Sequence, residues 1–319
     1  MRVVCLAGGV GGAKLADGLQ RVLAPGELTV IVNTGDDFER HSLLICPDHD
    51  TVAYTLAGLA DPVQGWGIAG ETWQVMDRLA DLGQETWFRI GDKDLATHLF
   101  RADRLHAGLR LTETALELQR ALGASSRILP MTDDPVRTRV RTDDGWLDFQ
   151  DYFVRLHQTP EVREVRYDGA AAAAATAEVR AAIGAADAIV VAPSNPVVSI
   201  GPILAVPGLM DEITAARRRG VQVVGVSGIV GGKAVRGPAD RMLSSLGEES
   251  SARGVARRYA AVGLLDTFVI DAADEAWAGE IRTLGLGVAV TDTIMSDVAA
   301  RARLAREMLA LVISGGVAA

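Results

Sequence analysis

The sequence predicts an α/β protein with a doubly wound, mostly parallel sheet that is interrupted by a small α-helical insertion. Short apolar segments alternate with segments of helical periodicity, which is typical of βαβ units and a parallel sheet. The first apolar segment runs directly into a glycine-rich turn. A long stretch before the middle of the chain has mainly helical periodicity, and we expect it to be the insertion.

Composition limits the classes of partner. The chain has 319 residues, of which 49% are hydrophobic and 5% aromatic, so the core is built mostly from Ala, Val, Leu and Ile. The formal net charge of −9 argues against nucleic acid or an anionic membrane as the main partner. The two cysteines form no disulfide framework, and we see neither a signal peptide nor a membrane-spanning apolar run. We therefore expect a cytoplasmic protein.

The N-terminal third begins with a βαβ unit. Residues 2–7 are expected to form a buried strand, residues 14–23 a helix, and residues 28–33 a second buried strand after a Pro-Gly turn. Residues 52–125 then carry several segments of helical spacing that end at glycine. The best strand candidate among them is residues 85–90. We expect a core of residues 1–55 and 126–319 and a helical insertion of residues 56–125.

The second half returns to alternating elements. The Asp143-Asp144-Gly145 turn predicts a hairpin, and the alanine-rich residues 170–183 predict a helix. Buried strands are expected at 188–192 and 221–227, and shorter ones at 267–270 and 287–290. Ligands of such folds bind at the carboxyl ends of the strands, so the segments that follow each strand are the candidate sites.

The segment after the first strand is a candidate anion site. It contains Gly8, Gly9, Gly11, Gly12 and Lys14, and it fits neither the dinucleotide fingerprint nor the P-loop pattern. Glycines nevertheless let backbone amides approach an anion at a helix N-terminus. A tight turn with a solvated lysine is the alternative interpretation.

Four aspartates follow the second strand: Asp36, Asp37, Asp48 and Asp50. Paired carboxylates suit Mg²⁺, which shares hard oxygen ligands with substrate phosphates. If the segment is extended, Asp48 and Asp50 point the same way and His49 points the opposite way. Turn chemistry is the alternative for Asp36 and Asp37.

Three later segments also carry polar groups. Asp94 is expected to cap a helix, which leaves Lys93 free to reach a ligand. Small polar side chains follow the strand at 188–192, and a second glycine-rich loop with two cations follows the strand at 221–227. The candidate residues of these two segments are Ser194, Asn195, Ser199, Gly231, Gly232, Lys233 and Arg236. Two such loops on one sheet suggest a ligand with two phosphates, or two separate ligands.

Taken in order, the motifs resemble those of the 2-phospho-L-lactate transferase family, whose actinobacterial branch is called phosphoenolpyruvate transferase. The segments that carry the resemblance are GGVGGAKLADGL, NTGDD, ICPDHDT, GDKDLATH, ILPMTDDPVRT, FQDYFVR, APSNPVVSIGPIL and GGKAVRGPADRML. The resemblance covers residues 2 to about 295.

The resemblance implies a Rossmann-like core and a role in the biosynthesis of the deazaflavin coenzyme F-420. Such enzymes transfer a phospho-acid from a guanosine-diphosphate-activated donor to the ribityl hydroxyl of the deazaflavin Fo. They release GMP, require Mg²⁺ and are usually dimeric. The acid, whether phosphoenolpyruvate, phospholactate or phosphoglycerate, is not encoded in these motifs.

The resemblance also implies roles for particular residues. Asp50 and Lys93 match catalytic positions at the Fo site, to which Asp48 also belongs. Asp36, Asp37, Asp48 and Asp50 are the metal candidates, and the two glycine loops with Ser194, Asn195 and Ser199 would surround the donor. Two departures are Lys93, where the family often has Arg, and Ser227-Gly228-Ile229-Val230, where it usually has Ser-Pro-Ile-Ile.

Two other functions are weighed against the transferase. The first is a non-enzymatic, nucleotide-sugar-binding regulator of carbon metabolism with a related core and a similar glycine-rich start. The second is an NAD-dependent oxidoreductase, which the broken fingerprint and the surplus of aspartates disfavour.

Overall fold

The computed structural model describes residues 1–313 and 315. In this part of the chain a seven-stranded sheet runs in the order β14-β13-β10-β9-β1-β2-β5, and its neighbouring strands pair in parallel. Its strands are β1 (Val3–Ala7), β2 (Leu28–Val32), β5 (Arg127–Pro130), β9 (Ala188–Val191), β10 (Gln222–Val226), β13 (Thr267–Asp271) and β14 (Gly287–Thr291). Strand order reverses between β1 and β9, so the doubly wound, Rossmann-like sheet is confirmed.

Alternate side chains of β1 enter different cores. Val3, Cys5 and Ala7 pack with α1 (Gly9–Val22), α2 (Pro47–Leu56) and α12 (Val298–Ile313). Val4 and Leu6 pack into the larger core on the other face. The helices that contribute to that core are α6 (Ala177–Gly184), α7 (Ile200–Ala205), α8 (Leu209–Arg218), α9 (Ala239–Ser245), α10 (Ala252–Ala261) and α11 (Ala278–Arg282). Helices on both faces explain why the strands are apolar throughout.

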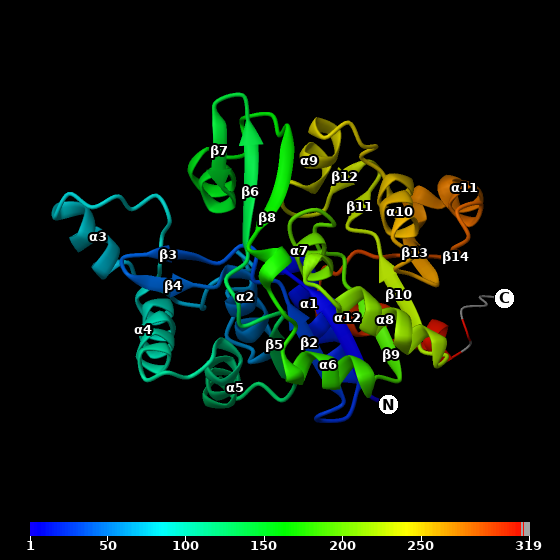
Figure 1. The fold of residues 1–319 in the computed structure, drawn as a ribbon, viewed down its shortest axis with the longest axis horizontal. Coiled ribbons are helices and arrows are strands. Elements are labelled where there is room, and N and C mark those ends of the chain that lie inside the picture. The colour runs from blue at the N-terminus through cyan, green and yellow to red at the C-terminus, as the bar shows by residue number, and fades with distance from the viewer. Residues whose placement is uncertain (314, 316–319) are drawn as a thin grey trace.

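Two smaller units extend from this body (Figure 1). A three-stranded antiparallel sheet contains β6 (Arg137–Thr142), β7 (Gly145–Asp148) and β8 (Glu164–Asp168), which confirms the hairpin predicted at Asp143–Gly145. The described chain also has short irregular helices at η1 (Asp151–Arg155), η2 (Ala170–Ala172) and η3 (Ala272–Trp277). Two short strands, β11 (Ile229–Val230) and β12 (Lys233–Ala234), pair with each other.

The helical range predicted as an insertion contains α3 (Gln74–Asp81), α4 (Asp92–His106) and α5 (Leu111–Leu122). A third apolar cluster, with Ile45, Met76 and Ile90 at its centre, joins this range to the hairpin of β3 (Phe38–Arg40) and β4 (Leu43–Ile45). The helical range therefore packs against residues that precede its predicted boundary at residue 56. They form a hairpin that the sequence pattern did not predict.

Three predicted elements are wrong in part or entirely. Residues 85–90 form no strand, because Phe88 and Ile90 bury their side chains against the β3–β4 hairpin while the backbone finds no strand to pair with. The helix predicted at 170–183 begins at Ala177, because the Thr176 hydroxyl accepts a hydrogen bond from the Val179 amide and caps it there. The helix expected from residue 14 begins at Gly9, so most of the glycines lie in its first turn.

Candidate functional site

A cavity of about 510 Å³ opens where β1 and β9 end, at the reversal of strand order. It extends from the segments that follow β1, β2, β9, β10 and β14 to the α2 helix and the helical insertion. Its volume lies within the usual range for small-molecule sites.

The glycine-rich first turn of α1 is pressed against the segment after β9. The Gly8 amide donates to Ser194 Oγ at 3.0 Å, and Ser194 Oγ donates back to the Gly8 carbonyl at 2.8 Å. A Cβ atom on Gly11 would lie 2.6 Å from the Pro193 carbonyl oxygen, and one on Gly12 would lie 2.6 Å from Ser194 Oγ. Glycine is required here because the two segments approach so closely.

The same turn forms part of the cavity wall. Gly8, Gly9, Gly11 and Lys14 line it, together with Ser194, Asn195, Ser199 and Arg236 from the later loops. Gly12 is buried behind them. The Lys14 ammonium donates to the Met295 carbonyl at 3.2 Å, and partial burial, Arg301 and Arg236 lower its pKa. Backbone amides at a helix N-terminus next to two cations form a suitable environment for phosphates.

Asn33 links two of the predicted metal ligands. Its side-chain amide donates to Asp36 Oδ1 at 3.1 Å and to Asp48 Oδ2 at 2.9 Å. Burial raises the pKa of Asp48 to about 6. Burial and the neighbouring Asp48 raise the pKa of Asp36 well above its usual range. Two buried carboxylates that repel each other at the cavity wall could share a divalent cation.

Asp50 lies in a different cluster. The PDHDT segment is the start of α2 and not an extended strand, so the expectation that Asp48 and Asp50 point the same way is wrong. On a helix, residues two apart lie on different faces. Asp50 forms a buried ion pair with Arg101 of α4, which also donates to the Leu44 carbonyl at 3.0 Å.

Burial alone would raise the pKa of the Asp50 carboxyl, but Arg101, His49 and His98 hold it well below its usual range. Removing one partner of a buried ion pair typically costs about 3–5 kcal/mol. The pair therefore joins α2 to the insertion and keeps Asp50 ionised at neutral pH.

Asp94 and His98 on α4 complete this second cluster. His98 Nε2 lies 3.3 Å from Asp94 Oδ2, and the Tyr54 hydroxyl donates to Asp94 Oδ1 at 2.5 Å. One ligand atom from each of Asp50, Asp94 and His98 lies within 4.8 Å of the others, so the group could hold a metal ion. We did not predict Asp94 or His98 as ligands, because we expected Asp94 to be a helix cap. That expectation is wrong: Gly91 precedes the first residue of α4, Asp92.

The remaining predicted residues lie away from this cavity. Asp37 lines a separate cavity of about 10 Å³ beside Cys46 and Arg101, so the four aspartates do not converge on one point. Burial raises the pKa of Asp37 to about 7. Lys93 is exposed, and its ammonium donates to the Ala69 carbonyl at 2.8 Å. It is not part of the cavity wall, whereas Arg89 is.

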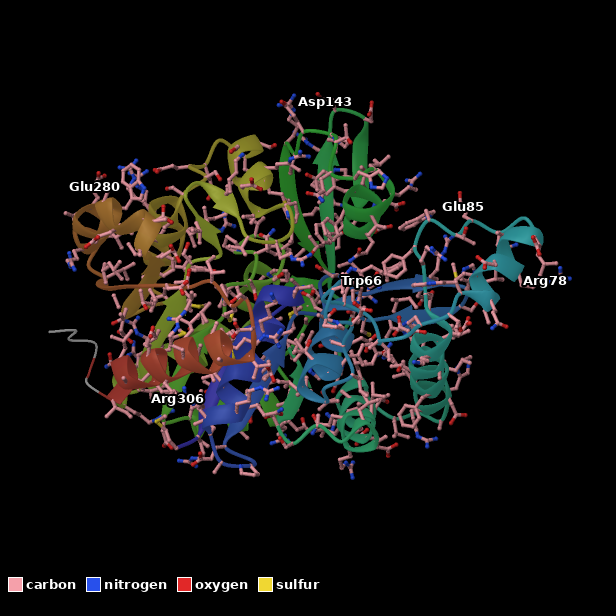
Figure 2. All side chains as sticks on the ribbon, turned by 180° about the vertical axis from the view of Figure 1, so that it is seen from behind. Trp66, Arg78, Glu85, Asp143, Glu280 and Arg306 are labelled. Atoms are coloured by element: carbon pink, nitrogen blue, oxygen red, sulfur yellow. The ribbon has the colours of Figure 1, made fainter. Side chains whose placement is uncertain are left out.

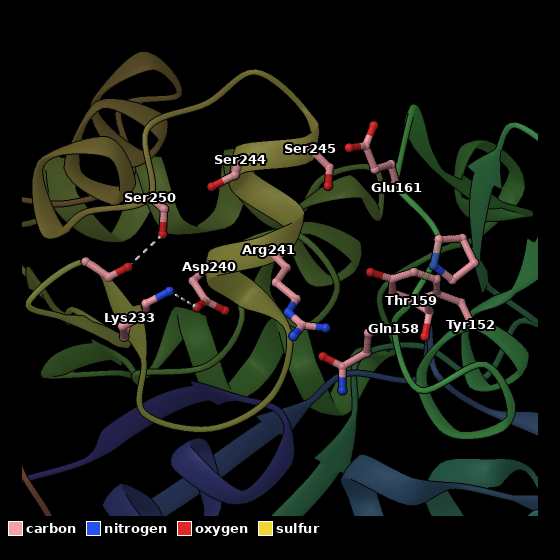
Figure 3. Close-up of a pocket in the computed structure, with 12 residues that line it drawn as sticks. Tyr152, Gln158, Thr159, Glu161, Lys233, Asp240, Arg241, Ser244, Ser245 and Ser250 are labelled. Atoms are coloured by element: carbon pink, nitrogen blue, oxygen red, sulfur yellow. Dashed lines mark hydrogen bonds and ion pairs between the residues drawn. The ribbon is translucent and has the colours of Figure 1, made fainter.

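The second glycine-rich loop is divided between two cavities. Arg236 lines the main cavity, but Gly232 and Lys233 line a more open one of about 340 Å³ beside α9. There the Lys233 ammonium lies 3.8 Å from Asp240, as Figure 3 shows. The Gly231 amide donates to Asp274 at 3.1 Å and faces neither cavity.

Aromatic side chains gather in the main cavity. Aromatic residues make up only 5% of the chain, yet Tyr54, Trp66, Phe88, Phe149 and Phe153 all line it. Trp66 and Phe88 come from the insertion, Tyr54 from α2, and Phe149 and Phe153 from the segment at η1. The sequence reasoning missed them because they come from four separate segments. The cavity wall thus combines groups suited to phosphates with side chains suited to an aromatic ring.

Comparisons with known proteins find relatives that match nearly the whole chain. The family model described as 2-phospho-L-lactate transferase CofD matches residues 3–297. A protein of Streptomyces griseus named phosphoenolpyruvate transferase is 45% identical over 316 residues, covering 98% of each chain. A protein of the same name from Mycobacterium avium is 41% identical over 333 residues, covering 95% of this chain and 96% of the relative.

A solved structure shares the fold. A protein member of the upf0052 family from Bacillus halodurans superposes with a TM-score of 0.62 at 16% identity, covering 97% of this chain and 98% of that one. In the described residues, no helix is both long enough and apolar enough to cross a membrane.

Proposed function

Because the chain belongs to the 2-phospho-L-lactate transferase CofD family and is therefore a phospho-acid transferase, we propose that it acts on the deazaflavin Fo. The donor is a small acid joined through a diphosphate to guanosine, that is, a phospho-acid joined to GMP, and GMP is released. The observation that carries the proposal is the make-up of the cavity wall, which contains the glycine turn, Lys14 and Arg236 together with five aromatic side chains. These two kinds of group match a donor with two phosphates and a flat acceptor.

The proposed reaction makes one bond and breaks one. The ribityl hydroxyl of Fo attacks the phosphorus next to the acid, and its proton passes to water. The bond from that phosphorus to the oxygen of GMP breaks, so a phosphodiester and GMP form. Such transfers depend mainly on positioning and charge neutralisation, and they need no covalent intermediate with the protein.

Residues from several parts of the cavity wall have roles in this proposal. Lys14, Arg236 and the first turn of α1 bind the donor phosphates. Asp50 accepts a hydrogen bond from the attacking hydroxyl and orients it. Because Arg101 holds the pKa of Asp50 low, this carboxylate is ionised but is a weak base, so orientation is its main contribution. Lys93 has no role here, since it lies outside the cavity wall.

Mg²⁺ is the proposed metal. Asp36 and Asp48 fit it because both are buried carboxylates at the cavity wall, and a cation between them would offset the repulsion that favours their protonated forms. The Asp50, Asp94 and His98 group is a second candidate. When bound, the cation would neutralise charge on the donor phosphates.

The test is a reconstituted reaction followed by mass spectrometry. The protein is incubated with Fo, Mg²⁺ and the guanylyl (GMP) derivative of phosphoenolpyruvate, phospholactate or phosphoglycerate. We expect GMP and a phosphodiester of Fo in equal amounts with at least one acid, and none after chelation of the metal. No product with any of the three donors would contradict the proposal, and binding of a nucleotide sugar in its place would favour a regulator.

The homodimer implied by the resemblance stays a prediction. Light scattering of the purified protein tests it: a mass twice that of the chain is expected, and the mass of a single chain would contradict it.

A further inference from the structure

Trp66 differs from the other tryptophans in having no ring partner. Among the described residues, four tryptophans contact an aromatic ring or a guanidinium: Trp73 with Arg89, Trp87 with Phe38, Trp146 with Arg166, and Trp277 with Arg253. The structure gives Trp66 no such contact, its residue is 45% exposed, and it lines the main cavity. An exposed indole at the wall of a cavity is suited to a ligand ring.

The segment that carries Trp66 is tied down at several points. Ala60 and Ile68 form an antiparallel bridge, and the Asp61 carboxylate accepts hydrogen bonds from the Val63 and Gln64 amides at 2.8 and 2.9 Å. The Gly65 amide donates to the Asp61 carbonyl at 2.8 Å. The loop of residues 59–69 therefore has a defined shape that holds the indole at the cavity.

Trp66 lies on the insertion side of the cavity. Figure 2 shows its side chain near the middle of the molecule, where the insertion meets the body. Its loop also packs on α1, because a Cβ atom on Gly65 would lie 3.0 Å from Val10 Cγ1. The cavity wall contains two further aromatic side chains from nearby in the sequence, Tyr54 and Phe88.

We propose that Trp66 stacks on the planar heteroaromatic ring of the acceptor and thereby selects a flat, fused-ring substrate. This inference rests on the proposed function, because it assigns the aromatic side chains of the cavity to the deazaflavin. It assigns the indole to the ring of the acceptor and not to the guanine of the donor.

Binding measurements with the full chain test the proposal. The fluorescence of Fo reports its own binding, and calorimetry reports binding of guanosine diphosphate. Trp66→Ala is expected to raise the Kd for Fo by about 5- to 150-fold, which corresponds to loss of stacking on one base-sized ring. Trp66→Phe retains a ring face and should recover most of the affinity. The Kd for guanosine diphosphate should change by less than about twofold.

Trp146→Ala is the matched control, because it removes an indole that is paired with Arg166 on the small antiparallel sheet. It should leave both Kd values unchanged. Trp66 is exposed, so thermal unfolding should show that Trp66→Ala is folded.

Unchanged Fo binding by Trp66→Ala, while the wild-type protein binds Fo, would overturn this inference and leave the proposed function standing. A larger loss for guanosine diphosphate than for Fo would assign the indole to the donor and would also overturn it. Failure of the wild-type protein to bind Fo at all would overturn both the inference and the proposed function.

Discussion

Asp48 and Asp50 are two residues apart, yet they have different partners. Asp48 faces Asn33 and Asp36, and Asp50 faces Arg101. The helical backbone of α2 separates them, and burial acts on both. The pKa of Asp48 is raised and that of Asp50 is lowered because only Asp50 has a guanidinium partner. For these two residues, the charged neighbours of each carboxyl decide whether its pKa is raised or lowered.

Lys14 and Lys93 provide a matched pair of cations at the residue scale. Lys14→Ala should raise the Kd for guanosine diphosphate about tenfold, because it removes a cation from the wall that faces the phosphates. Lys93→Ala should leave the Kd values of both guanosine diphosphate and Fo unchanged, since Lys14 lines the cavity and Lys93 does not. Calorimetry measures both. A loss of Fo binding in Lys93→Ala would restore the role that the family resemblance implies.

Asp37 should make folding stability depend on pH. Its folded pKa of about 7 lies above the ordinary value of 3.8, so the folded state holds its proton more tightly than the unfolded state does. The resulting stability is fully present below the unfolded pKa and is lost as pH rises toward 7. Asp37 should contribute a fall in the free energy of unfolding with a slope that approaches about 1.4 kcal/mol per pH unit in this window.

Asp37→Asn removes that contribution, so its slope between pH 5 and 7 should be shallower than that of the wild type. Urea unfolding with a chelator present measures the slope without bound metal. Asp148→Asn, on an exposed carboxylate, is the control and should behave as the wild type. Equal slopes for Asp37→Asn and the wild type would show that Asp37 does not titrate as its burial implies.

At the scale of elements, the first turn of α1 shows why glycine is present where a helix would ordinarily favour alanine. Gly11→Ala adds a methyl group 2.6 Å from the Pro193 carbonyl oxygen, so we expect a loss of about 1–3 kcal/mol in the free energy of unfolding. Gly184→Ala at the end of α6 meets no atom within 4 Å and should gain up to about 1 kcal/mol. Urea unfolding compares the two variants. Equal or greater stability of Gly11→Ala would contradict the close packing of α1 on the β9 loop.

Strands could be predicted from the sequence where a run of apolar residues was the dominant signal. The strands β1, β2, β9, β10, β13 and β14 are apolar because both faces of the sheet are covered, and each was found within about a residue of its bounds. The β3–β4 hairpin has three-residue strands, too short for alternation to show. The helical start of α2 was missed because Asp48 and Asp50 suggested paired ligands, whereas Pro47 at its first position is an ordinary helix start.

At the scale of the whole molecule, sheet topology places the site. Strand order reverses between β1 and β9, so the segments after these strands separate and leave the crevice in which Gly8, Ser194 and Ser199 meet. The position of this crevice can be predicted from a βαβ pattern with polar segments after the strands. The aromatic wall cannot, because it needs Trp66, Phe88 and Phe149 to converge from distant positions through tertiary packing.

The whole molecule also contains the second cavity, beside α9, which competes with the main cavity as a donor site. It includes Gly232, Lys233 and Arg241, the first two of which we expected at the donor. In the described part of the chain, the glycine turn of α1 lines the main cavity and does not line this second one.

The most direct test of the account is a crystal structure of the protein with Fo, guanosine diphosphate and Mg²⁺ bound together. We predict nucleotide phosphates against the first turn of α1 and Arg236, the deazaflavin ring against Trp66, and the cation at Asp36 and Asp48 or at Asp50, Asp94 and His98. Density for the nucleotide beside Lys233 and Arg241, or for the deazaflavin away from the aromatic side chains, would contradict the proposal that one cavity binds both ligands.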